Sequence, residues 1–394
     1  MSQRPFDGNG HGRQSEPPRS ARAGSAAEAA VVDDIEVIPV ASLAQAVGFP
    51  APPPSTSSRR PAQRRALLLS TANTTSTLPM SAAREMAKRA VTIAAAGGHN
   101  LLMVGPPGSG KTMLAKRLPT ILPQLSTGES LETTRIYSVL GLLSSGQPLM
   151  ATRPFRSPHH TISEAGLVGG GSPPGPGEIS LAHHGVLFLD ELPEFNRRTL
   201  EVLRQPLEDC QVTIARAVRT TTFPANFMLV GALNPCPCGY RNDPRRDCHC
   251  SVPQVERYMA KISGPLLDRI DIQIEVPAIA YRELSSQTAG TSSAVMRESV
   301  TATRDRQLAR FQGSGTRRNA QMTPRELRKH CPLDPAGVEL MRTAMSDLGL
   351  SARAHDKVLR VARTIADLDT AEAITVSHLS EAINYRMLDR NLWA

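Results

Sequence analysis

Eight consecutive residues constrain the fold of this chain more than any other stretch: positions 105–112 read Gly-Pro-Pro-Gly-Ser-Gly-Lys-Thr. They match the phosphate-loop pattern G-x-x-x-x-G-K-S/T at every fixed position. An apolar run of strand length (residues 100–104) precedes the loop, and a helical pattern (residues 113–118) follows it. This order lets backbone N–H groups and the start of a helix surround phosphate oxygens. The candidate nucleotide-binding residues are Gly105, Pro106, Pro107, Gly108, Ser109, Gly110, Lys111 and Thr112.

Two acidic residues close a second apolar run, where the carboxyl end of a central parallel strand is expected. Asp190 and Glu191 end the stretch Gly-Val-Leu-Phe-Leu-Asp-Glu over residues 185–191. We expect Thr112 and Asp190 to hold Mg²⁺, and Glu191 to polarise the water that attacks the γ-phosphate. Lys111 is expected to contact the β- and γ-phosphates.

Three further polar residues are candidates for the same chemistry. Asn234 comes shortly after a third apolar run, and its amide is expected to orient the attacking water. Arg269 precedes the last predicted strand, and a guanidinium from a neighbouring subunit can stabilise charge on a transferring phosphoryl group. The alternative for Arg269 is an ion pair with Asp268 or Asp271. Arg353 begins a predicted helix, from which it is expected to contact the same phosphates.

Apolar runs alternate with helical patterns between residues 79 and 278, which predicts an α/β fold with a parallel sheet and helices on both faces. Helical patterns over residues 334–348, 352–368 and 377–387 predict a C-terminal helical domain, with Ser377 as an N-cap. The predicted domains are residues 1–78, mostly disordered; residues 79–278, the nucleotide-binding core; and residues 279–394, a linker and helical lid.

Two segments inside the predicted core are candidates for functional loops. Residues 141–180 are dense in Gly, Pro and Ser, and a loop of this length in a compact domain is mobile or functional. Residues 211–223 alternate in the manner of a β-hairpin. The pairs His159-His160 and His183-His184 are expected to have structural or substrate-loop roles, because neighbouring side chains face apart in an extended chain.

The formal net charge is +9, with 45 Lys and Arg against 36 Asp and Glu. Nine basic and three acidic residues lie between Arg297 and Lys329. This stretch indicates either a polyanionic partner such as DNA or an ordinary solvated face. No stretch has the length of a membrane span, and the N-terminus lacks the pattern of a secretion signal. We therefore expect a cytoplasmic location and no membrane partner.

Four of the six cysteines are clustered, with the spacing C-x-C-x₉-C-x-C. Four thiolates can close a tetrahedral zinc site, although each pair is spaced more tightly than the usual C-x₂₋₄-C. The alternatives are a metal-free loop rich in Gly and Pro, and redox or iron chemistry. The candidate zinc ligands are Cys236, Cys238, Cys248 and Cys250.

Several long segments together resemble the magnesium-chelatase-like AAA+ ATPases of the YifB/ComM type. The likeness covers roughly residues 80–394 and includes a C-terminal lid pattern, Ser-Ala-Arg-Ala, at residues 351–354. Members carry an N-terminal Lon-protease-like domain, of which only residues 35–47 resemble a remnant here. The segments that carry the resemblance are Phe-Arg-Ser-Pro-His-His (155–160), Pro-Gly-Glu-Ile-Ser-Leu-Ala-His-His-Gly (176–185), Asn-Pro-Cys-Pro-Cys-Gly (234–239) and Ser-Gly-Pro-Leu-Leu-Asp-Arg-Ile-Asp (263–271).

The resemblance implies an AAA+ P-loop NTPase that forms a ring, expected to be a hexamer, with ATP and Mg²⁺ between subunits. It also implies that residues 141–180 are a helix-2 insertion and residues 211–223 a pre-sensor hairpin, both facing the central pore. Its implied residue roles are Lys111 in Walker A, Asp190 and Glu191 in Walker B, Asn234 as sensor 1, Arg269 as arginine finger and Arg353 as sensor 2.

The leading hypothesis for function is an ATP-hydrolysing DNA helicase that promotes branch migration in recombination or natural transformation. One alternative is a chelatase-type or chaperone-like ATPase that remodels a protein partner. Another is a nucleotide-gated binding module with little turnover.

Overall fold

The computed structural model describes residues 19–22, 37–40, 82–143, 149–215, 220–241, 243, 246–278 and 291–388. The chain divides into two compact units, residues 1–70 with 143–150, and residues 71–142 with 151–394. In the first unit, β1 (Arg19–Arg22) and β2 (Val37–Val40) form a parallel pair. Most of the segment expected to be disordered, and the helical part of the expected remnant, lie outside the described residues. All further description concerns the second unit.

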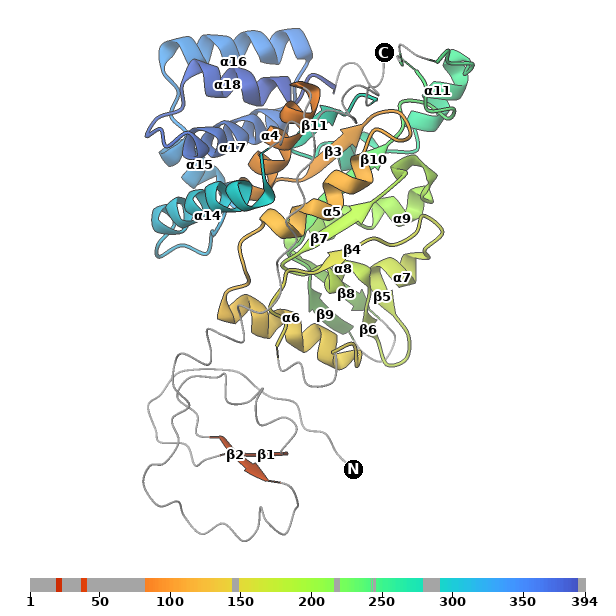
Figure 1. The fold of residues 1–394 in the computed structure, drawn as a ribbon, viewed down its shortest axis with the longest axis vertical. Helices are drawn as coiled ribbons and strands as arrows, with labels where there is room; N and C mark the ends of the chain where they lie inside the picture. The colour runs from red at the N-terminus through yellow and green to blue at the C-terminus, as the bar shows by residue number, and fades with distance from the viewer. Residues whose placement is uncertain are drawn as a thin grey trace. The chain divides into compact units, whose positions relative to one another are not determined.

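Five strands form one central sheet in which every neighbouring pair is parallel (Figure 1). The strand order is β11-β3-β10-β7-β4, so the phosphate-loop strand β3 lies between two others. The predicted parallel sheet with helices on both faces is confirmed. The strands are β3 (Leu101–Val104), β4 (Phe155–Arg156), β7 (Val186–Leu189), β10 (Met228–Leu233) and β11 (Ile272–Glu275).

Both faces of the sheet are buried, which explains the continuous apolar runs in the sequence. In β3, Leu101 and Met103 join one hydrophobic core, while Leu102 and Val104 join the other. This split follows from the two-residue period of a strand, and burying each such side chain contributes about 1.5–3 kcal/mol. The face that carries Leu101 and Met103 is covered by the helices α4 (Ala82–Gly97), α5 (Lys111–Ile121) and α14 (Ser293–Arg310).

Shorter elements make up the rest of the core region. Two short helices, α9 and α10, follow one another, and Val202 and Leu203 form the turn between them. These elements are α6 (Thr127–Val139), α7 (Glu164–Val168), α8 (Glu178–Leu181), η1 (Leu192–Glu194), α9 (Arg197–Glu201), α10 (Arg204–Asp209), α11 (Val252–Met259) and α12 (Gly264–Leu267).

The expected insertion at residues 141–180 is not a single loop. It contains β4, which is an edge strand of the central sheet, together with an antiparallel pair, β5 (Gly169–Gly170) and β6 (Gly175–Pro176). The predicted hairpin is confirmed as β8 (Gln211–Ala215) and β9 (Thr220–Pro224). Its turn lies outside the described residues.

The C-terminal region is helical, as predicted, and α17 packs against both α18 and α4. The predicted N-cap of the last helix was wrong: Thr375, rather than Ser377, caps it, because the Thr375 hydroxyl accepts a hydrogen bond from the N–H of His378. Among the described helices, none combines the length and the apolar character needed to cross a membrane. The elements are η2 (Asn319–Gln321), α15 (Pro324–His330), α16 (Pro335–Leu348), α17 (Ala352–Leu368) and α18 (Val376–Asn384).

Candidate nucleotide-binding site

The loop between β3 and α5 depends on glycine at defined positions. Gly108 and Gly110 have left-handed backbones, with φ of 76° and 94°, a conformation that glycine adopts without steric cost. At Gly105 an added Cβ would lie 2.1 Å from the carbonyl oxygen of Val276, so no larger residue fits there. The loop therefore passes close to the end of β11 before α5 begins at Lys111.

Lys111, at the start of α5, is only 7% exposed and is surrounded by oxygen atoms that accept hydrogen bonds. Its Nζ donates to the carbonyl oxygens of Gly105 (2.6 Å) and Pro106 (2.9 Å) and to Oδ1 of Asn234 (3.2 Å). Burial lowers the pKa of Lys111 to about 8, although the charges of Asp190 and Glu191 raise it in part. Its cationic head is thus held at the loop, where an anionic ligand would meet it.

The residues expected to hold Mg²⁺ are adjacent. The Thr112 hydroxyl donates to Oδ2 of Asp190 (2.6 Å), and the other carboxylate oxygen of Asp190 accepts the N–H of Glu191 (3.0 Å). Hydroxyl and carboxylate oxygens are the ligands that Mg²⁺ prefers, so this pair fits the ion. The Glu191 side chain is 54% exposed. The backbone of Glu191 is left-handed, with φ of 52°, and it directly precedes η1.

The structure brings together Lys111, Thr112, Asp190, Glu191 and Asn234. They follow β3, β7 and β10, which are adjacent parallel strands, so their carboxyl ends meet at one edge of the sheet. This is the place where open α/β sheets bind their ligands.

One neighbour of this site was not predicted. Nδ1 of His160 lies 3.6 Å from Oε2 of Glu191, and the His160 ring contacts Phe195 edge-on. His160 comes four residues after β4, which pairs with β7 in parallel and so brings its following loop beside Glu191. The short strand β4 gives no apolar run in the sequence, so this proximity had no local signal.

Arg269 and Arg353 lie at the opposite end of the sheet from the phosphate loop of their own chain. They line a cavity of about 760 Å³ together with Asn100 and Asp271, which directly precede β3 and β11. Arg353 is exposed in the first turn of α17. Because α17 packs at the amino ends of the strands, where Lys357 donates to Asp271, Arg353 lies away from the phosphate loop of its own chain.

Arg269 has neither of the ion pairs considered from the sequence. Its guanidinium instead pairs with Glu208 (2.5 Å) and donates to the carbonyl oxygens of Pro265 (2.6 Å) and Arg204 (3.1 Å). The side chain of Glu208 is half exposed, whereas that of Arg269 is 11% exposed. The amide of Asn100 also donates to the carbonyl oxygen of Arg269 (2.9 Å), which fixes its backbone to the start of β3.

Comparison with known proteins agrees with this arrangement. The family model described as magnesium chelatase, subunit ChlI, matches residues 80–284, and the model of its C-terminal part matches residues 290–386. This chain belongs to the magnesium chelatase ChlI family of AAA+ ATPases.

Three relatives in this family show how much of the chain is shared. The chain is 48% identical over 311 residues to the uncharacterized protein YifB of Escherichia coli, 45% over 310 residues to the competence protein ComM of Haemophilus influenzae, and 41% over 304 residues to Rv2897c of Mycobacterium tuberculosis. These matches cover 77–78% of this chain. The chain spans about 60% of the length of each relative.

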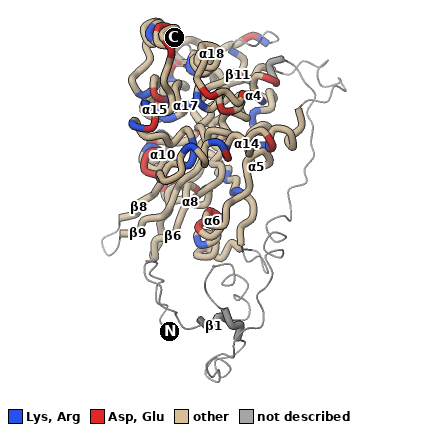
Figure 2. The backbone as a smooth tube through the Cα atoms, turned by 90° about the vertical axis from the view of Figure 1, so that its left-hand side faces the viewer, with Lys and Arg blue, Asp and Glu red and all other residues tan. Residues whose placement is uncertain are grey.

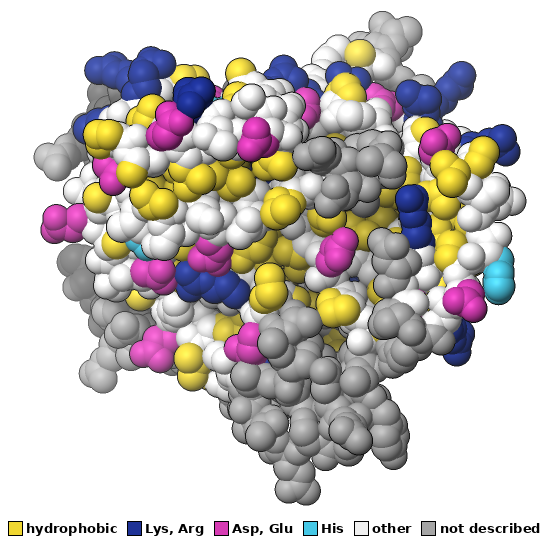
Figure 3. Space-filling view, turned by 90° about the horizontal axis from the view of Figure 1, so that it is seen from above, with side chains coloured by type: hydrophobic (Ala, Val, Ile, Leu, Met, Phe, Trp, Pro, Cys, Tyr) yellow, Lys and Arg dark blue, Asp and Glu magenta, His cyan; other side chains and the backbone are white. Residues whose placement is uncertain are grey.

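Much of the basic stretch is used inside this ChlI-family chain. Among the described residues, Arg297 and Arg304 donate to the carbonyl oxygens of Thr120 (2.6 Å) and Ala95 (2.7 Å). Lys and Arg are interspersed with Asp and Glu in two views of the molecule, rather than gathered in a stripe (Figures 2 and 3). Three more arginines of the stretch also donate hydrogen bonds within the chain: Arg306, Arg310 and Arg318. The exposed remainder is Arg317, Arg325, Arg328 and Lys329.

The histidine pair at residues 183–184 does not face apart as expected. The left-handed backbone of His184, with φ of 58°, brings the two ring centroids to 3.8 Å. Nε2 of His183 and Nε2 of His184 lie 3.2 and 2.7 Å from Oε2 of Glu132. Burial, together with the neighbouring His184, lowers the pKa of His183 to about 4. Both neutral rings can satisfy one carboxylate, which is a structural role for the pair.

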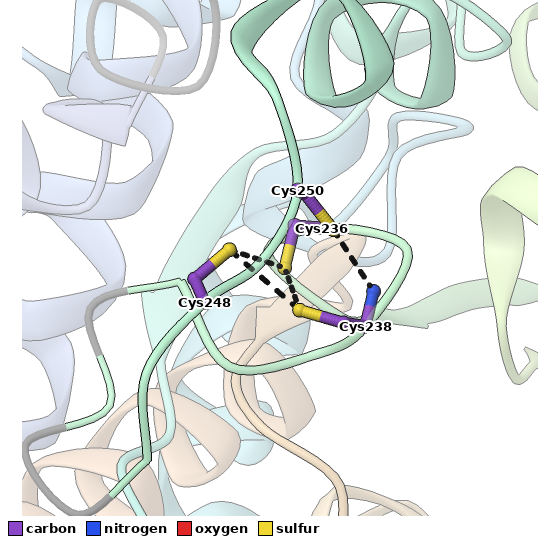
Figure 4. A group of neighbouring side chains, drawn as sticks. All are labelled: Cys236, Cys238, Cys248 and Cys250. Atoms are coloured by element: carbon purple, nitrogen blue, oxygen red, sulfur yellow. Dashed lines mark hydrogen bonds between the residues drawn. The ribbon is translucent and has the colours of Figure 1, made fainter.

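The four clustered cysteines converge after β10. Cys236 and Cys238 follow that strand, Cys248 and Cys250 precede α11, and all four side chains point toward one another (Figure 4). Their Sγ atoms all lie within 4.8 Å of one another, and all are free thiols. The four candidate ligands are thus adjacent in the fold.

Proposed function

We propose that this protein is an ATP-hydrolysing AAA+ motor that acts on DNA as a homo-oligomeric ring, expected to be a hexamer. Within this proposal it is a helicase or branch-migration factor in recombination or natural transformation, working in the cytoplasm where ATP and DNA are found. The observation that carries it is the convergence of Lys111, Thr112, Asp190, Glu191 and Asn234 at one edge of a parallel sheet.

Each of these side chains has a distinct part in ATP hydrolysis. Lys111 neutralises phosphate charge, and Thr112 with Asp190 would hold Mg²⁺, which screens the phosphates when bound. Glu191 is exposed enough to accept a proton from water, and Asn234 would orient that water by its amide. These roles need only side chains that already lie beside one another.

The position of Arg269 and Arg353 supports a ring. The nucleotide site lies at the carboxyl ends of the strands, whereas these two cations line a cavity at the amino ends. A protomer therefore presents a nucleotide site at one end of its sheet and two guanidiniums at the other. Head-to-tail association joins unlike surfaces in this way and closes into a ring when the rotation allows.

The DNA part of the proposal is supported by the exposed hairpin and by one relative. In β8, Val212 and Ile214 are buried while the alternate residues are exposed, so one face of the hairpin is anchored and the other is free. Thr213 and Thr222 share a hydrogen bond across the exposed face (3.1 Å). The relative from Haemophilus influenzae is named a competence protein.

The second candidate function is a chelatase-type ATPase that remodels a protein partner. The family description, a subunit of magnesium chelatase, favours it.

ATP turnover measured with and without DNA tests the proposal. We expect turnover that single-stranded or branched DNA increases and that Lys111→Ala abolishes, together with a solution mass that rises to a ring when ATP and DNA are both present. Unchanged turnover and no binding of DNA at low salt would favour the protein-remodelling function, because DNA contacts by basic residues strengthen as salt falls.

A further inference from the structure

The geometry of the four thiols matches a tetrahedral metal site. The Sγ of Cys236 lies 3.3 Å from that of Cys238 and 3.6 Å from that of Cys248, and Cys238 and Cys248 are also 3.6 Å apart. Four sulfurs about 2.3 Å from a central Zn²⁺ lie roughly 3.8 Å apart. One ion can therefore bind all four thiolates after only small shifts, and a site filled by four protein ligands is of the structural kind.

Backbone N–H groups also point at the sulfurs. The N–H of Cys238 donates to Sγ of Cys250, and the N–H of Arg241 donates to Sγ of Cys236, both at 3.4 Å. Gly239 has the left-handed backbone that closes the turn, with φ of 86°, and its N–H donates to the carbonyl oxygen of Cys236. Such donors favour the ionised thiolate that metal binding requires.

The segment that carries the cysteines needs a fixed point. Between β10 and α11, the described residues form neither helix nor strand. Cys236 is nevertheless fully buried, in the hydrophobic core that also contains Leu102 and Val104. A long irregular segment inside a compact domain gains little from backbone hydrogen bonding. Metal ligation from both of its ends would supply the missing order, because the free energy of binding becomes free energy of folding.

The same segment is joined to the nucleotide site on two sides. Asn234, whose Oδ1 lies 3.2 Å from Nζ of Lys111, is two residues before Cys236. Gly239 lies against the phosphate loop, so closely that an added Cβ would be 2.7 Å from Cδ of Pro107. The cysteine cluster is thus in a position to fix both Asn234 and one side of the loop.

We propose that Cys236, Cys238, Cys248 and Cys250 bind one structural Zn²⁺ ion, and that this ion positions Asn234 and the phosphate loop for nucleotide. The zinc site stands on the cysteines alone, whereas its effect on nucleotide rests on the ATP-binding function proposed above. The cysteines are positioning residues, since they act on the nucleotide through Asn234 and Pro107.

The first test is the metal content of the purified full chain, measured by mass spectrometry of the elements. We expect about one zinc per chain, and the absorption bands of tetrahedral thiolate coordination after replacement by Co²⁺. Cys248→Ser should lose the zinc, and the matched control Cys210→Ser, which changes an exposed cysteine outside the cluster, should keep it. Absence of bound metal, or iron in place of zinc, overturns the site.

The second test is the affinity for a non-hydrolysable ATP analogue. Cys248→Ser should bind it about tenfold or more weakly, because small displacements in such sites have effects of this size, and Cys210→Ser should bind it as the unchanged protein does. Should Cys248→Ser fail to fold, zinc is removed from the unchanged protein by a chelator that spares Mg²⁺ and is then restored. Affinity should fall and return.

The outcomes separate the two proposals. If the purified protein contains zinc but its affinity for the ATP analogue does not change when the zinc is removed, the positioning role is overturned. Zinc bound by a protein that takes up no nucleotide at all overturns the ATP-binding function and leaves the metal site standing. Asn234→Ala should keep its zinc and still bind the analogue more weakly, and normal affinity in that variant would contradict the link through Asn234.

Discussion

Lys111 makes nucleotide affinity depend on pH. Burial lowers its pKa to about 8, and the positive charge that attracts phosphate is therefore lost in the free protein above that pH. We expect the Kd for a non-hydrolysable ATP analogue to be constant near pH 7 and to rise by up to about tenfold per pH unit above pH 8. Calorimetry at several pH values measures this. Lys111→Arg keeps its charge and should show a flat profile, so an equal slope in that variant would contradict the assignment.

Glu191 should affect the chemical step and not the binding of nucleotide. Its carboxylate is exposed beside Asp190, and Glu191→Gln keeps the shape but removes the base, so we expect kcat for ATP to fall by about 10²–10⁴-fold with an unchanged Kd. Glu194→Gln is the matched control, because Glu194 ends the short helix η1 that directly follows Glu191 and its side chain is 43% exposed. Equal loss in both variants, by single-turnover kinetics, would exclude Glu191 as the base.

At the scale of elements, a buried ion pair fixes α17 to the sheet. Lys357 donates to Asp271 at the start of β11, and both side chains are nearly buried, at 12% and 10% exposure. Burial raises the pKa of Asp271, but the charge of Lys357 and the neighbouring His99 ring lower it more, and the net pKa lies well below the usual value. The stability from this carboxylate is therefore present above pH 4 and lost as the pH falls below it.

Asp271→Asn should lower the free energy of unfolding by about 3–5 kcal/mol at pH 7, because it leaves the buried charge of Lys357 without a partner. Asp369→Asn, in the exposed pair with Arg89, should cost less than about 1 kcal/mol. Denaturant titration of both variants compares them. The difference between unchanged protein and Asp271→Asn should shrink toward pH 3, and a constant difference would place the effect elsewhere.

The sequence predicted those elements whose signal is local. The strands β3, β7 and β10 are buried apolar runs, and the phosphate loop is a continuous motif, so their positions followed directly. The strand β4 could not be predicted, because it has only two residues and exists through pairing with β7. The docking of α17 was equally hidden, since Asp271 and Lys357 are 86 residues apart and nothing near either of them indicates the pair.

At the scale of the whole molecule, the proposed ring places the two ends of the sheet on opposite sides of each contact between protomers. Lys111 lies at the carboxyl ends of the strands, and Arg269 lines the cavity at the amino ends. If each site takes its guanidinium from a neighbour, then Lys111→Ala and Arg269→Ala damage different halves of a site. We therefore expect each variant alone to lack ATP turnover and an equal mixture of the two to regain it.

The size of that recovery follows from random assembly. A working interface needs an intact Lys111 on one side and an intact Arg269 on the other, so about a quarter of the interfaces in mixed rings would be complete. A mixture of Lys111→Ala with Glu191→Gln is the matched control, because both changes lie in the same half of the site and every interface stays damaged. Recovery in the control, or none in the first mixture, would contradict the shared site. Because Arg353 lines the same cavity, Arg353→Ala mixed with Lys111→Ala should recover in the same way.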